Sequence, residues 1–193
     1  MFPGRPGEAP YEADAPTDPP NLYGETKRDG EKVVLEVTRE TGSGVVLRVP
    51  VLYGKAEKNA ESAVNTLVDA VWKAQDKKNT RVKMDDWAQR YPTNTEDVGR
   101  VCRDVAVKYL SVSASDRTSL PRTLQFSSED RMTKYGMCEV FAEILGVPMP
   151  GMERVSEGPK ADEVQRPYDT HLSTRALREL GISVETQDFK AWW

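Results

Sequence analysis

Tyr23 and Lys27 lie four residues apart in the stretch NLYGETK, where a helix is expected to begin. Four residues make about one helical turn, so both side chains point the same way. An ammonium beside a phenol favours the phenolate and makes the tyrosine a better proton donor or acceptor, which is chemistry that reduction of a carbonyl requires. A chain with seven tyrosines also acquires such a Y-x-x-x-K pair by chance, so the context of the pair must decide.

A helix and a buried strand must position this pair. The helix is predicted from Leu22 to Glu40, because Asn21 follows a double proline and suits the N-cap. The next run, VVLRVPVLYG at residues 45–54, is almost continuously apolar and β-branched, which favours a strand buried on both faces, as in a parallel sheet. Pro50 cannot donate to a sheet, so the strand should end or bend there. Strand ends are where open α/β sheets contact ligands.

The remaining chain alternates predicted helices with short strands, an order that favours an α/β fold with parallel sheet. Thr93 and Glu96 have the spacing of a capping box for one helix. Residues 1–20, rich in Pro, Gly and acids, are expected to be an extended segment that precedes the α/β part, residues 21–193. Further helices are expected at 61–75, 93–110, 133–145 and 173–180, strands at 81–87, 122–128 and 154–155, and a polar loop at 76–80.

Composition excludes several classes of protein. The 193-residue chain has a net charge of −4 and no basic block, which argues against nucleic-acid binding. No apolar run approaches the length of a membrane span, and the first residues do not have the pattern of a signal peptide, so a cytoplasmic protein is expected. Cys102 and Cys138 fall on apolar helix faces and are predicted to be buried structural thiols. With His171 as the single histidine, a Cys/His metal cluster is excluded.

Other charged residues allow two interpretations each. Arg48 lies within the apolar strand and needs an acidic partner that the sequence does not identify. Arg90 sits with Trp87 and Tyr91, a combination found both at binding surfaces and in lids over a core. Arg166 begins the run RPYDTHL, which suits either an anion contact or a surface loop. His171 has no carboxylate partner in view and is expected to be structural.

Several motifs together resemble a known family. PPNLYGETKRDGEKVVLE resembles the active-site helix of the extended short-chain dehydrogenase/reductase superfamily, within it the dTDP-4-dehydrorhamnose reductase branch. LRVPVLYG, RYPTNTEDVGRVC, LQFSSEDRMTKYGMCEVFAEILG and VQRPYDTHLSTRALRELGI follow in the order of that branch. The segments LYG-x-TK-x-DGEK, ESAV, MD-x-W-x-QR-x-PT and QRP are most similar to the regulatory (beta) subunits of methionine adenosyltransferase. The resemblance covers about Pro10 to Ile182.

The resemblance implies a Rossmann-like NAD(P)-binding fold with a small substrate-binding lobe. It assigns Tyr23 to protonation of a carbonyl oxygen and Lys27 to the nicotinamide ribose of NADP, and it places Pro50 to Leu52 against the nicotinamide. The glycine-rich first βαβ half of the family is not matched, and no G-x-G-x-x-G occurs in the chain. The chain therefore resembles the C-terminal part of a family member, a partial Rossmann-like fold of the type that includes RmlD-like substrate-binding domains.

Three functions follow from the resemblance. The first is a regulatory, non-catalytic subunit that binds the catalytic subunit of methionine adenosyltransferase and supports S-adenosylmethionine synthesis. The second is an NADPH-dependent reductase of a nucleotide-linked 4-keto sugar. The third is a remnant without activity. The ESAV and MD-x-W-x-QR-x-PT segments favour the first, although the family's longer C-terminal tail is not matched by DFKAWW.

Overall fold

The computed structural model describes residues 1–75, 81–160 and 162–193, so the loop expected at 76–80 lies outside it. The strands of these residues pair in three two-stranded sheets, all parallel. This confirms the prediction of an α/β fold with parallel sheet. The pairs are β1 (Val46–Arg48) with β5 (Thr123–Gln125), β2 (Leu52–Tyr53) with β4 (Thr93–Asn94), and β3 (Val82–Asp85) with β6 (Met152–Val155).

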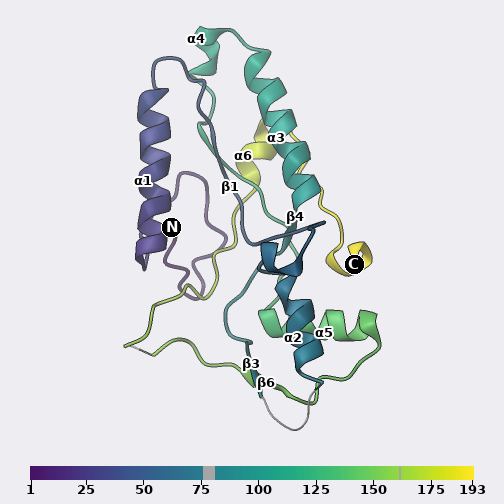
Figure 1. The fold of residues 1–193 in the computed structure, drawn as a ribbon. Coiled ribbons are helices and arrows are strands. Elements are labelled where there is room, and N and C mark those ends of the chain that lie inside the picture. The colour runs from purple at the N-terminus through teal and green to yellow at the C-terminus, as the bar shows by residue number, and fades with distance from the viewer. Residues whose placement is uncertain (76–80, 161) are drawn as a thin grey trace.

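Helices flank these sheets on both sides of the molecule (Figure 1). The 3₁₀ turn η1 precedes α2, so the helix expected at 61–75 begins only at Thr66. The capping box predicted at Thr93 is wrong, because Thr93 belongs to β4 and Asn94 caps α3 by accepting from the Glu96 N–H at 2.8 Å. The helical elements are α1 (Leu22–Val37), η1 (Asn59–Glu61), α2 (Thr66–Lys73), α3 (Thr95–Leu110), α4 (Ala114–Arg117), α5 (Lys134–Leu145), α6 (Arg175–Glu179) and α7 (Phe189–Trp192).

The apolar run 45–54 breaks at its proline, as predicted. β1 ends at Arg48, the chain passes through Pro50, and β2 resumes at Leu52 beside a different partner strand. The change of sheet occurs because Pro50 has no N–H to continue the ladder. Consequently the backbone at residues 49–51 turns across the middle of the molecule, where it can line a site.

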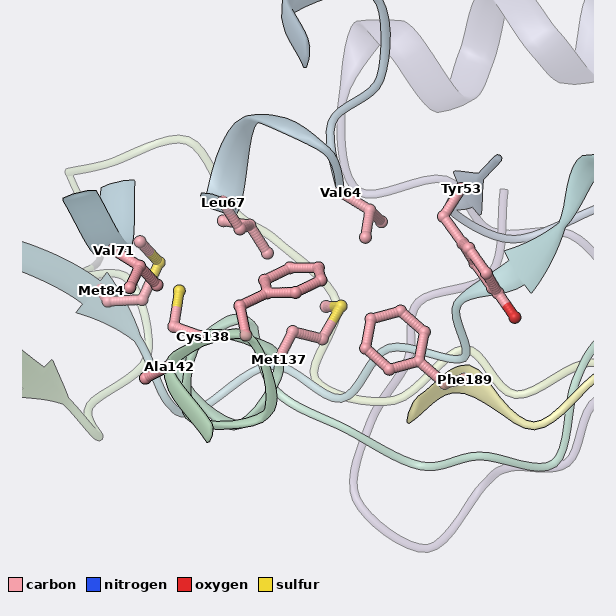
Figure 2. Packing of buried hydrophobic residues seen from close by; sticks show 10 residues of the cluster. Tyr53, Val64, Leu67, Val71, Met84, Met137, Cys138, Ala142 and Phe189 are labelled. Carbon is pink, nitrogen blue, oxygen red and sulfur yellow. The ribbon is translucent and has the colours of Figure 1, made fainter. Parts of the chain in front are cut away.

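The two larger of three apolar clusters in the described residues contribute most of the core. One joins α3, β5 and α6 through Val101, Leu124 and Leu177, none of which is measurably exposed. The other joins α2 to α5, with Met137 near Leu67 and Cys138 (Figure 2), and it also contains Val71 and Phe141. The prediction of two buried thiols is half wrong, because Cys138 is buried whereas Cys102 is exposed. Cys102 lies at the edge of the apolar face of α3. The side chains of that face that reach the core are those of Val101, Val105 and Tyr109.

The C-terminal residues form a short helix, α7, that sequence periodicity did not indicate. Its N-cap is Asp188, which accepts from the Ala191 N–H at 2.7 Å. Phe189 is buried in the α2–α5 cluster, and its ring meets Tyr53 edge-on with 4.9 Å between centroids (Figure 2). The terminal Trp193 packs edge-on against Phe141. These aromatic contacts fix the end of the chain to the core.

Candidate functional site

A cleft of about 760 Å³ lies where the start of α1 faces the carboxyl end of β1. Tyr23 and Lys27 border it from α1, and Pro50 and Leu52 border it from the segment between β1 and β2. The structure therefore brings together Tyr23, Lys27, Pro50 and Leu52, the four residues to which the family resemblance assigns a role. Its other walls come from the N-terminal residues, from 89–91 and from 167–172.

Tyr23 and Lys27 do share one face of α1. The Lys27 ammonium lies 5.4 Å from the centre of the Tyr23 ring, within the range of a cation–π contact. Asn21 fixes this turn, since its side-chain oxygen accepts from the Gly24 N–H at 3.0 Å while its amide donates to the Gln165 carbonyl at 3.1 Å. Tyr23 is 73% exposed, so its phenol is open to a ligand or to a partner.

Arg48 has the acidic partner that its burial requires, and that partner is Glu31. The guanidinium donates from Nε and Nη2 to the two carboxylate oxygens, both at 2.9 Å, with side chains only 11% and 13% exposed. A third donor, Nη1, reaches the Ala13 carbonyl at 3.1 Å. This bidentate pair ties α1 to the end of β1 and so holds Tyr23 and Lys27 against the cleft. Sequence reasoning missed Glu31, although it follows Lys27 by one turn on the same face.

Arg90 borders the cleft, and its charge interacts with those of Lys134 and Arg166, neither of which lines the cleft. Arg90 is within 3.6 Å of Asp85, its only ion-pair partner among the described residues. Burial lowers the pKa of Arg90, and Arg166 lowers it further. Burial also lowers the pKa of Lys134, with Arg90 and Arg166 adding to the effect. Like charges held together in this way favour binding of an anion such as a phosphate or carboxylate.

The sequence analysis did not single out Lys134, although its position in the sequence is unusual for a lysine. It occupies the first position of α5, directly after the cap Thr133. A cation there faces the positive end of the helix dipole, which is unfavourable unless another role requires it. Arg90, for which a binding surface and a lid were equal alternatives, borders the cleft directly.

His171 has more polar surroundings than expected. Its ring stacks on Tyr91 with centroids 4.0 Å apart. Nε2 lies 3.1 Å from a Glu129 carboxylate oxygen, although without the geometry of a hydrogen bond. The expectation of no carboxylate partner is therefore wrong. The stacked ring and the Tyr11 N–H bond to its carbonyl, at 2.8 Å, still give the residue a structural role.

The walls of the cleft combine apolar and polar groups. Pro50 and Leu52 give it an apolar wall, and the exposed Tyr23 and Lys27 add a phenol and an ammonium group that can form hydrogen bonds with a ligand. The chain has no glycine-rich turn leading into a helix N-terminus, which is how such folds hold a pyrophosphate. Across residues 1–75, 81–160 and 162–193, no group of three or more His, Cys, Asp or Glu side chains is placed to hold a metal ion. In the same ranges no helix is both long and apolar enough to cross a bilayer.

Comparison with known proteins gives a consistent family. The model of the RmlD substrate binding domain matches residues 1–191. Methionine adenosyltransferase 2 subunit beta of Rattus norvegicus is 38% identical over 177 residues, 92% of this chain and 49% of the relative. The dTDP-4-dehydrorhamnose reductase of Streptomyces griseus is 48% identical over 59 residues, 31% of this chain and 18% of the relative. The chain thus spans about half the length of the beta subunits that it matches.

Solved structures agree on the fold. The dTDP-4-dehydrorhamnose reductase of Bacillus anthracis, solved in complex with NADP, superposes with a TM-score of 0.69 at 19% identity. The match covers 98% of this chain and 58% of the reductase chain. The expectation of part of a Rossmann-like, NAD(P)-binding fold is confirmed at the level of architecture.

Proposed function

Because the chain belongs to the RmlD substrate binding domain family, we propose that it is a regulatory protein that acts as a beta-type subunit of methionine adenosyltransferase. It would bind a catalytic subunit of that enzyme and support S-adenosylmethionine synthesis without performing a reaction itself. The observation that carries this proposal is the extent of similarity. Identity to the beta subunit runs over 92% of the chain, whereas identity to the reductase relative is confined to 31%.

The cleft has a role in this proposal as a ligand site. Tyr23 and Lys27 would hold the ribose next to the nicotinamide of NADP, and Pro50 and Leu52 would contact the ring. The bound dinucleotide supplies a hydride in reductases; here it would serve as a structural ligand. The pyrophosphate and adenosine need groups beyond those that this chain offers, so the affinity of the chain alone should be low.

A second function, reduction of a nucleotide-linked 4-keto sugar, is supported by a different observation. The Tyr23–Lys27 pair is present and accessible, as a proton donor to a carbonyl oxygen must be. Arg90 borders the cleft and interacts with the nearby charges of Lys134 and Arg166, so the phosphates of a nucleotide sugar would offset their positive charge. In this function Tyr23 would give its proton to the sugar oxygen while Lys27 steadies the phenolate.

Binding to the synthetase tests the first proposal directly. We expect the purified chain to co-elute with a methionine adenosyltransferase catalytic subunit and to change its KM or kcat for methionine. The exposed Arg103→Ala variant, whose substitution lies outside the cleft, serves as a matched control and should behave as the wild type. A mixture that elutes as two separate species at every concentration tested would refute the regulatory proposal.

Oxidation of NADPH with a 4-keto sugar nucleotide tests the alternative. If the chain is a reductase, turnover occurs and is lost in Tyr23→Phe by about 10²-fold or more. Tyr135→Phe is the matched control, because Tyr135 stacks beneath Arg154 in contact with the α2–α5 cluster and does not border the cleft. Co-elution without oxidation supports the regulatory role, and turnover without co-elution supports the reductase.

A further inference from the structure

Lys134 is the first residue of α5, and contacts with another segment hold the chain on either side of it. Arg90 and Met132 form an antiparallel bridge, in which each N–H donates to the other carbonyl, at 2.7 and 2.9 Å. The Thr133 hydroxyl donates to Asp86 Oδ1 at 2.7 Å and so ties the N-cap of α5 to the residue after β3. Helical side chains lean toward the N-terminus of their helix, so the Lys134 amine extends toward this fixed segment.

No carboxylate neutralises the Lys134 amine. In the part of the chain that the structure describes, Lys134 takes part in no ion pair, because the neighbouring acids have other partners. Asp85, whose charge acts on Lys134, lies 3.6 Å from Arg90. Asp86 lies 3.7 Å from Arg154. The amine therefore stays available for another contact.

Two arginines act on the same amine. Burial lowers the pKa of Lys134, the charges of Arg90 and Arg166 lower it further, and Asp85 opposes them with a smaller effect than Arg90. A larger share of the amine is therefore uncharged near neutral pH, and an uncharged amine is a nucleophile. Arg166 is exposed, so its guanidinium is open to an anion that approaches from solvent.

We propose that Lys134 forms a reversible imine with a small aldehyde that carries a phosphate or a carboxylate group. Arg90 and Arg166 hold the anionic group, and the Lys134 nitrogen attacks the carbonyl carbon. A C–N bond forms and becomes a double bond, both hydrogens of the neutral amine leave with the carbonyl oxygen as water, and nothing is oxidised or reduced. Hydrolysis of the imine releases the aldehyde unchanged. This site does not depend on the role proposed above for the whole chain.

Other lysines lack one part of this arrangement. Lys32 and Lys190 are paired with carboxylates, at 3.7 and 2.5 Å, which favours their charged form. Lys27 lies 5.4 Å from the centre of the Tyr23 ring, a contact that also favours the ammonium. Lys83 is exposed on β3 and serves as a reference for an ordinary amine.

Labelling with pyridoxal phosphate tests the proposal, since this probe carries both an aldehyde and a phosphate. The full chain is incubated with the probe at neutral pH, the imine is reduced with borohydride, and mass spectrometry locates the adducts. We expect Lys134 to be modified faster than Lys83 by about tenfold or more, because clustered cations concentrate an anionic reagent. Pyridoxal, which has no phosphate, should show a much weaker preference. Inorganic phosphate should slow the labelling of Lys134 but not that of Lys83.

Substitutions separate the amine from the cations that surround it. Lys134→Arg keeps the positive charge but removes the amine, so the main adduct should disappear, whereas Lys83→Arg should be labelled at Lys134 as in the wild type. Arg166→Gln should slow the reaction of Lys134 with pyridoxal phosphate more than its reaction with pyridoxal. The exposed Arg103→Gln is the matched control and should change neither rate.

The comparison of two lysines within the wild-type chain does not require any variant to fold, and circular dichroism establishes the folding of each variant. Equal labelling of Lys134 and Lys83, a main adduct at Lys27, or equal preference with pyridoxal and its phosphate would each overturn the proposal.

Discussion

The Arg48–Glu31 pair provides the sharpest test of how the candidate site is held. In Glu31→Ala, Arg48 keeps its bond to the Ala13 carbonyl but loses both carboxylate contacts while only 11% exposed. Breaking a buried ion pair by removing one partner costs about 3–5 kcal/mol, and the remaining bond and slight exposure of Arg48 place this case near 3 kcal/mol.

Chemical denaturation followed by circular dichroism measures this loss. For a chain of this length 3 kcal/mol corresponds to a fall in Tm of roughly 6–12 °C. Asp104→Ala breaks an ion pair whose arginine, Arg103, is 69% exposed, and it should cost less than about 0.5 kcal/mol. Glu31→Leu/Arg48→Met, which replaces both charges by apolar groups, should recover most of the stability. A loss below about 1 kcal/mol in Glu31→Ala would refute the view that the pair anchors α1.

Four further predictions concern groups outside this pair. In the native protein a maleimide should modify Cys102 but not Cys138, whose pKa burial raises to about 12, and mass spectrometry should count one adduct before unfolding and two after. Because the Cys138 thiol ionises from about pH 9 only in the unfolded chain, the free energy of unfolding should fall above that pH by up to ~1.4 kcal/mol per unit, and less steeply in Cys138→Ala. Lys134→Met should stabilise the protein at pH 7, since burial lowers the pKa of Lys134, and the gain should vanish as the pH approaches 10.5, where the unfolded lysine also loses its proton. Gly146→Ala, at a φ of +65°, should cost roughly 1 kcal/mol in a thermal melt, whereas Gly99→Ala, within α3 and without close neighbours, should gain a similar amount.

Elements with strong local signals were predictable from sequence. Asn21 and Thr133 cap α1 and α5 as expected, since a side-chain oxygen at the N-cap position is decided by neighbours a few residues away. Pro50 divides β1 from β2 for an equally local reason, its missing N–H. α7 was not predictable, because four residues carry too little periodicity and its position depends on Tyr53 and Phe141, which are distant in sequence.

The candidate site was half predictable. The proximity of Tyr23 and Lys27 could be predicted from their spacing in the sequence, because both lie on one helix. Glu31, Arg90 and Lys134 were not, since the partner of each charge depends on how β1, the 89–91 segment and α5 pack. A buried cation in a sequence indicates that an acidic partner is required, but the sequence does not identify that partner. Cys102 was predicted to be buried but is exposed. A residue at the edge of an apolar helix face can remain exposed even when its neighbours on that face are buried.

The exposure of Tyr23 bears on which function the cleft performs. The Lys27 ammonium lies 5.4 Å from the centre of the Tyr23 ring. At a separation of about 5 Å in water, an ammonium stabilises a unit negative charge by only about 0.8 kcal/mol, too little to direct proton transfer. The same pair in a dry site would interact several times more strongly, so catalysis requires a surface that excludes water from the phenol. The chain by itself leaves Tyr23 73% exposed. A partner or ligand that covered the phenol would change that, and without one the exposed cleft is better suited to binding than to turnover.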